Sequence, residues 1–142
     1  MAPELANLLR IGKLKAEPPN VRELTGLLAS GERRLRDARR VDLAFDSRFD
    51  LAYNAAHALA LYALRRQGCR SDNRYLVFQV LPHTLGLPAA QWRVLAKAHE
   101  RRNLAEYEGH LEYDDQLLLD LLAATGLLLT AIHGLSAPDA TP

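Results

Sequence analysis

The sequence has few residues that favour β-structure and almost no cysteine. Valine and isoleucine together number 7 of 142 residues, and Cys69 is the single cysteine. A β-sandwich, a β-barrel or a parallel α/β sheet is rich in β-branched residues, so the composition argues against each of these folds. A lone cysteine excludes a disulfide within the chain and a Cys-rich zinc site, and it is typical of a reducing, cytoplasmic setting.

Motifs that carry well-defined chemistry are also missing. The chain has no Gly-rich phosphate loop, no Gly-x-Ser-x-Gly nucleophile elbow and no cysteine with a positioned base. Its 5 histidines include no pair at the i,i+4 spacing of a zinc site. The sequence therefore predicts no metal and no cofactor.

No segment has the pattern of a targeting signal or a membrane span. The first 15 residues lack a signal-peptide layout because Arg10, Lys13 and Lys15 interrupt the apolar stretch. Residues 117–135 are the most apolar segment, but Asp120 and other polar residues dilute it. We therefore expect a buried helix at 117–135 and no membrane association.

Leucine and alanine are abundant, at 29 and 22 of the 142 residues, and both are strong helix formers. The length suits one globular domain with a real core, and the formal net charge is +1. We therefore predict a single all-α domain over residues 1–142. Its expected architecture is an up-and-down helical bundle of four to five main helices.

The first part of the chain predicts a short helix and then a longer one. Residues 1–19 are expected to form an N-terminal extension whose helix stops before Pro18. Asn20 is placed to cap the next helix. Ser30 and Gly31 are expected to bend or break that helix before its charged second half.

The rest of the chain predicts a central helix and three more. The central helix is apolar on nearly all sides, and Asp46 or Ser47 is placed to cap its start. Gly68 is placed to end it. The expected ranges are 48–67 for the central helix, then 75–81, 88–107 and 114–134, with a frayed tail at 136–142.

The expected helix at 88–107 changes character along its length. On a helical wheel at about 100° per residue, its first half shows an apolar inner face around Leu95. In its last two turns, Arg102 and Glu106 lie in the middle of that same face, flanked by His99 and Asn103. A buried Arg without a partner costs several kcal/mol, so the position of Arg102 needs a reason.

Two explanations of Arg102 are open at this point. In the first, Arg102 pairs with Glu106 at i,i+4, or with an acid on another helix, and only fixes the packing. In the second, it lines a wet cleft as an anion site for phosphate, where an otherwise apolar helix turns polar. The two differ in whether Arg102 is sealed against a carboxylate or open to a cleft.

A narrow polar stripe also follows the central helix. We interpret it as a solvent-facing or interface strip, with the alternative that His57 contributes to the Arg102 cleft. The stripe consists of Asp50, Asn54, His57 and Arg65, together with Leu61.

Five arginines fall within the eight residues 33–40. A solvated charged face is one interpretation, and phosphate contacts from Arg36, Arg39 and Arg40 are the other. Residues 1–74 carry 14 basic and 9 acidic groups, a net +5, whereas residues 75–142 carry 4 basic and 8 acidic groups, a net −4. This separation of charge suits pairing with a second copy of the chain, or binding of RNA by the basic face.

Two runs of residues form a recognisable pair. The first lies on the central helix, which closes with Arg-Arg-Gln-Gly, and the second lies at the end of the 88–107 helix. They are Tyr53-Asn54-Ala55-Ala56 and Arg102-Asn103-Leu104-Ala105-Glu106-Tyr107. Over about residues 24–135 the chain resembles the HEPN domains (higher eukaryotes and prokaryotes nucleotide-binding). The resemblance implies a helical bundle, a homodimer, and a place in toxin–antitoxin or other stress systems.

Active members of that family are metal-independent ribonucleases, so the resemblance also implies roles for residues. An Arg steadies the scissile phosphate, and a His four to six residues later does acid–base chemistry. Arg102 and Asn103 match the start of that motif, but Tyr107 stands where a His is expected and is a poor base at neutral pH. His110 comes later, in an expected loop. His99 and Glu106 are then the candidate acid–base groups.

The sequence thus predicts a HEPN-like protein that binds or cleaves RNA at an Arg102-centred phosphate site in a dimer cleft. The alternative is a catalytically inactive HEPN-like binding or scaffold protein that pairs with a nucleotidyltransferase-like antitoxin partner. The candidate catalytic residues are Arg102, Glu106 and His99. The candidate phosphate-binding or nucleic-acid-binding residues are Arg102, Asn103, Tyr107, Arg36, Arg39 and Arg40.

Overall fold

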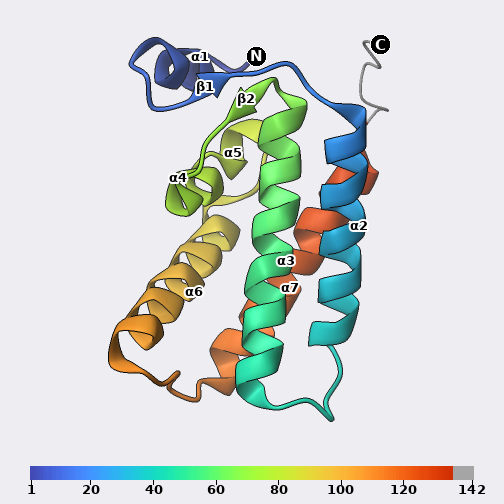
Figure 1. Cartoon of the computed structure of the whole chain (residues 1–142), viewed down its shortest axis with the longest axis vertical. Helices are drawn as coiled ribbons and strands as arrows, with labels where there is room; N and C mark the ends of the chain where they lie inside the picture. The colour runs from blue at the N-terminus through green and yellow to red at the C-terminus, as the bar shows by residue number, and fades with distance from the viewer. Residues whose placement is uncertain (136–142) are drawn as a thin grey trace.

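Four long helices that run alternately down and up form the body of the protein (Figure 1). The computed structural model describes residues 1–135, so the predicted frayed tail at 136–142 lies outside the described residues. The predicted all-α bundle is confirmed. The long helices are α2 (Val21–Ala38), α3 (Phe45–Arg66), α6 (Ala89–Glu108) and α7 (Asp115–His133).

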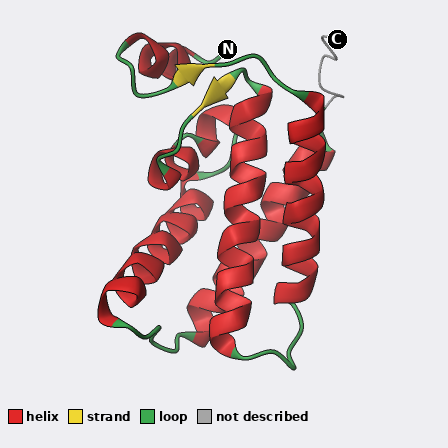
Figure 2. Cartoon of the chain, in the orientation of Figure 1, coloured by secondary structure: helices red, strands yellow, loops and turns green. Residues whose placement is uncertain are grey.

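Short elements gather at one end of the bundle, as Figure 2 shows by secondary structure. The predicted short helix at 75–81 is confirmed as α4, followed at once by α5. The short elements are α1 (Pro3–Arg10), β1 (Lys15–Ala16), β2 (Cys69–Arg70), α4 (Arg74–Gln79) and α5 (Leu81–Thr84).

The predicted cap at Asn20 is confirmed by its hydrogen bond, and Asp114 caps the start of a second helix. The Asn20 side chain accepts from the backbone N–H of Glu23 at 3.0 Å, which starts α2. The Asp114 side chain accepts from the N–H of Leu117 at 2.9 Å, which starts α7. Both side chains satisfy a donor that the first helical turn leaves without a partner.

Two predictions about helix ends are wrong. The helix α2 runs unbroken through Ser30 and Gly31, because Gly31 lies where α2 crosses α3, and packing outweighs its low helix propensity. A Cβ atom added at Gly31 would approach Leu59 Cδ2 to 2.5 Å. The helix α3 begins at Phe45, before both predicted caps, so Asp46 lies inside its first turn and Ser47 does not cap it.

The N-terminal segment is tied to the bundle by a short ribbon and by Arg65. Strand β1 pairs antiparallel with β2, which joins residues 15–16 to residues 69–70. The Arg65 guanidinium is 1% exposed, and its Nη1 donates to the Glu17 carbonyl at 2.9 Å. Its Nε lies 2.6 Å from Glu23 Oε1. The interpretation of Arg65 as part of a solvent-facing strip is therefore wrong, because these acceptors satisfy it inside the fold.

The helix α3 occupies the middle of the molecule, between α2 and α6 in Figure 1, and packs against α7 as well. Half of its buried residues are alanines, which let neighbouring helices approach closely, and larger rings lie at Phe49, Tyr53 and Tyr62. By length and composition alone α7 could cross a membrane, but the core helix of a bundle passes the same test, and Leu121 and Leu128 of α7 are fully buried here.

Candidate functional site

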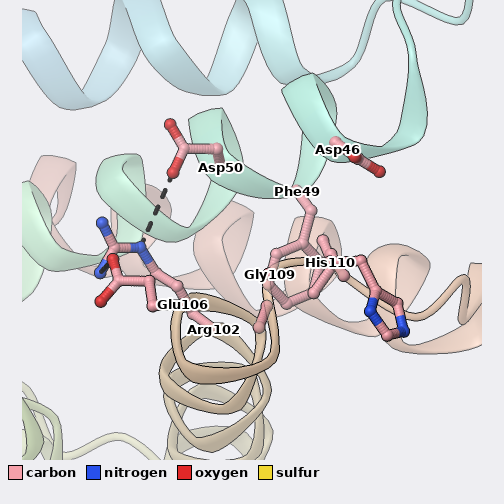
Figure 3. Close-up of a pocket in the computed structure, with 9 residues that line it drawn as sticks. Asp46, Phe49, Asp50, Arg102, Glu106, Gly109 and His110 are labelled. Atoms are coloured by element: carbon pink, nitrogen blue, oxygen red, sulfur yellow. Dashed lines mark ion pairs between the residues drawn. The ribbon is translucent and has the colours of Figure 1, made fainter.

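A cavity of about 410 Å³ lies between the start of α3 and the end of α6 (Figure 3). Its wall mixes carboxylates and one guanidinium with an apolar floor. The lining residues are Asp46, Phe49, Asp50, Arg102, Ala105, Glu106, Gly109, His110 and Leu111. The polar end of α6 that the helical wheel singled out therefore borders a cavity.

Arg102 has two carboxylate partners at this cavity. Its Nη1 lies 3.1 Å from Glu106 Oε1, the predicted i,i+4 pair, and its Nε lies 3.7 Å from Asp50 Oδ1 on α3. The Arg102 side chain is 27% exposed, whereas those of Asp50 and Glu106 are 62% and 64% exposed. Arg102 is therefore paired and still open to solvent. Pairs with such exposed partners contribute at most about 1 kcal/mol.

Behind Arg102 lies the ring of Tyr53, which is fully buried. The guanidinium carbon of Arg102 is 4.8 Å from the centre of this ring. Arg74, from α4, approaches the same ring at 5.7 Å, and its Nη1 donates to Asn54 Oδ1 at 3.2 Å. Two cations from separate helices thus converge on one aromatic ring, within the range of cation–π attraction.

A hydrogen-bonded chain orients His99 beside these cations. The Tyr53 hydroxyl lies 2.8 Å from His99 Nδ1, and the Asn103 amide nitrogen lies 3.0 Å from His99 Nε2. With the amide donating to Nε2, the ring proton sits on Nδ1 and is donated to the Tyr53 oxygen. Both ring nitrogens of His99 are therefore engaged, and the ring is held in one orientation.

The two histidines nearest Arg74 and Arg102 are kept neutral. Burial, and then the charges of Arg74, His99 and Arg102, lower the pKa of His57 to about 4. Burial, and then Arg102 and Arg74, also lower the pKa of His99, against a smaller opposing effect of Glu100. At neutral pH the only positive charges of this cluster are therefore the two guanidinium groups.

Some predicted site residues lie apart from this cluster. Tyr107 is 92% exposed and is not among the residues that line the cavity. The exposed arginines of 33–40 lie on α2 or directly after its last residue, Ala38. Helix α2 lies on the opposite side of α3 from α6 (Figure 1). Arg36, Arg39 and Arg40 are thus away from Arg102 in this chain, and Arg40 instead pairs with Asp42 at 2.7 Å.

Three residues near Arg102 escaped the site prediction. Arg74 belongs to no motif, and Tyr53 enters the sequence prediction only through the family resemblance. His110 lies after the end of α6, as the sequence predicts, and it lines the cavity with Arg102. A signal for His110 was present, because Gly109 ends α6 in the left-handed region at φ 84° and turns the chain back.

Among residues 1–135, no cluster of three or more His, Cys, Asp or Glu side chains has the arrangement of a metal site. Comparisons with protein-family models, with curated proteins and with solved structures give no match to this chain.

Proposed function

We propose that this chain binds RNA through a phosphate site formed by Arg74 and Arg102, as a HEPN-like protein of a toxin–antitoxin or stress system. The observation that supports the proposal is the convergence of the two guanidinium groups on the Tyr53 ring. Both guanidinium groups also act on His99 and lower its pKa, so an anion bound beside His99 is attracted by both. A phosphate diester suits the site because arginine binds phosphate oxygens through paired N–H donors.

The carboxylates near Arg102 are compatible with this role. Asp50 and Glu106 are both mostly exposed, so a bound phosphate can replace them on Arg102 at little cost in free energy. Glu106 then orients Arg102 in the free protein. Asn103 fixes His99 from the other side of the site.

Cleavage needs a group that receives a proton, and we assign this step to His99. The 2′-oxygen of RNA forms a bond to phosphorus, the bond to the 5′-oxygen breaks, His99 takes the 2′ proton, and water protonates the leaving oxygen. His99 must release the Asn103 amide from Nε2 to do so. Phosphate binding, which requires no such rearrangement, is therefore the better supported half of the proposal.

A second candidate function is a catalytically inactive scaffold that pairs with a nucleotidyltransferase-like partner. The observation in its favour is that Arg102 already has two carboxylate partners and His99 has both ring nitrogens engaged. In either case we propose a homodimer, with the Arg102 cavity facing the second copy.

The first test measures the affinity for a fluorescent RNA oligonucleotide at several salt concentrations. Arg102→Ala and Arg74→Ala are each expected to weaken binding about tenfold or more and to reduce the salt slope by about 1. Arg93→Ala, an exposed Arg on the same helix α6, is the matched control and should stay within about twofold of wild type. If Arg102→Ala binds like Arg93→Ala, there is no phosphate site at Arg102.

Asp50→Asn separates the two functions in the same assay. If Arg102 receives phosphate, removing the competing carboxylate tightens RNA binding. If Arg102 only fixes packing, the variant loses stability and its affinity for RNA does not rise. Incubating wild type and His99→Gln with the same RNA, and with its 2′-deoxy analogue, then tests cleavage. If wild type leaves the RNA intact, the protein binds RNA without cleaving it.

A further inference from the structure

We infer that an aromatic surface beside the phosphate site stacks an unpaired RNA base, so that the substrate is single-stranded RNA. The surface consists of Tyr75 on α4 and Trp92 on α6. This inference rests on the proposed function, because it places a base next to the phosphate that Arg74 and Arg102 hold.

The aromatic surface is continuous with the phosphate site. The ring centres of Trp92 and Tyr75 are 6.5 Å apart, and those of Tyr75 and His99 are 5.8 Å apart. His99 in turn stacks with Tyr53 at 6.0 Å, and Arg102 lies over Tyr53. A row of rings therefore leads from the surface to the guanidinium of Arg102.

Tyr75 is not needed to anchor its own helix. Helix α4 is held by Val77 and Phe78, which are fully buried. Tyr75 remains 36% exposed, and its neighbour Arg74 reaches the Tyr53 ring. An exposed ring on an anchored helix, directly after a cation of the phosphate site, is well placed to contact a base.

The other exposed tyrosines of the described chain lack this setting. Tyr113 is 72% exposed, and its ring contacts Phe45, the first residue of α3. Tyr107 is 92% exposed. Among residues 1–135, Tyr75 is the exposed tyrosine whose ring contacts His99 of the Arg102 cluster.

Base stacking selects single strands for a physical reason. In a duplex the bases are stacked on one another, and their faces are not available to a protein side chain. An aromatic side chain accepts the face of any unstacked base, so the preference is for strandedness rather than sequence. We therefore expect little discrimination among the four bases at this position.

The test compares binding of a fluorescent single-stranded RNA with binding of the same RNA in a duplex. Wild type should prefer the single strand. Tyr75→Ala and Tyr75→Leu should each weaken single-strand binding about 5- to 150-fold, while Tyr75→Phe stays within about threefold of wild type. Tyr113→Ala is the matched control for loss of an exposed tyrosine and should bind like wild type.

The outcomes separate this inference from the phosphate site. If Tyr75→Ala and Tyr75→Leu bind as wild type does while Arg102→Ala binds weakly, the base subsite is wrong and the phosphate site stands. If Tyr75→Phe is as weak as Tyr75→Ala, the hydroxyl acts rather than the ring, and stacking is overturned. If Arg74→Ala and Arg102→Ala also bind normally, the proposed function itself fails.

Discussion

At the scale of single residues, the partners of an arginine decide whether its guanidinium group can bind a ligand, as Arg65 and Arg102 show. Arg65 is 1% exposed and bonds to the carbonyls of Glu17, Pro18 and Cys69 as well as to Glu23. Its donors are satisfied inside the fold, so no ligand is needed. The carboxylates that face Arg102 are mostly exposed, and a ligand can displace them.

His57 gives the protein a predictable response to acid. Its pKa is lowered from 6.5 to about 4, first by burial and then by Arg74, His99 and Arg102. Below pH 6.5 the unfolded chain binds a proton at His57 that the folded chain does not bind until about pH 4. The stability that His57 contributes is therefore present above pH 6.5 and is lost as the pH falls toward 4.

We predict that His57→Gln flattens this part of the pH profile. Urea unfolding at several values between about pH 4.5 and 7.5 should show wild type losing on the order of 1–3 kcal/mol that the variant does not lose. His110→Gln, at an exposed histidine, is the control and should keep the slope of wild type. Equal slopes for wild type and His57→Gln would mean that His57 titrates as a solvated group.

At the scale of elements, the contact between α2 and α3 depends on the missing side chain of Gly31. A Cβ atom there would lie 2.5 Å from Leu59 Cδ2 and 2.7 Å from Leu59 Cγ. Gly26 lies on the same helix, and a Cβ atom there meets nothing within 4 Å. The two glycines differ only in what faces them, so they form a matched pair.

We predict opposite effects for the two alanine substitutions. Gly31→Ala should lower the free energy of unfolding by about 1–3 kcal/mol, because the methyl group displaces Leu59. Gly26→Ala should raise it by up to about 1 kcal/mol, because alanine is the better helix former. Denaturant unfolding of both variants is the measurement. A stabilised Gly31→Ala would show that α2 and α3 separate at no cost.

The two ends of helix α6 have different surroundings, the core at one end and the cavity at the other. Leu95 and Ala98 in its first half are fully buried. Its last turns border the cavity at the start of α3. Where the helix leaves the core, Arg102 and Glu106 replace the apolar residues of its inner face. The change from apolar to polar residues in the sequence therefore marks the cavity.

At the scale of the whole molecule, the N-terminal residues 1–19 contribute two side chains to the core. Leu5 is fully buried and Leu14 is 3% exposed, within the same core cluster as Leu59 and Leu95. The carbonyls of Glu17 and Pro18 accept hydrogen bonds from Arg65 at 2.9 and 2.8 Å. The N-terminal segment and the bundle should therefore unfold together.

Trp92 is the single tryptophan and lies on α6, which makes its fluorescence a probe remote from α1 in the sequence. We predict that Leu5→Ala lowers the unfolding free energy seen by this probe by about 2–5 kcal/mol. Ile11→Ala is the control, because Ile11 is 51% exposed, and should change it by less than about 1 kcal/mol. An unchanged midpoint for Leu5→Ala would mean that residues 1–19 unfold separately.

The sequence by itself determined the helical class, most helix positions, the cap at Asn20, and the unusual place of Arg102. These features depend on local propensity and on periodicity, which are properties of neighbouring residues. Only the tertiary structure decided that α2 continues through Gly31 and that Arg65 is buried. It also decided that Arg74 and Arg102 approach the same ring, and that His110 and Arg102 line the same cavity. Each of these depends on contacts between segments far apart in the chain, and packing energy between helices overrides local preference there.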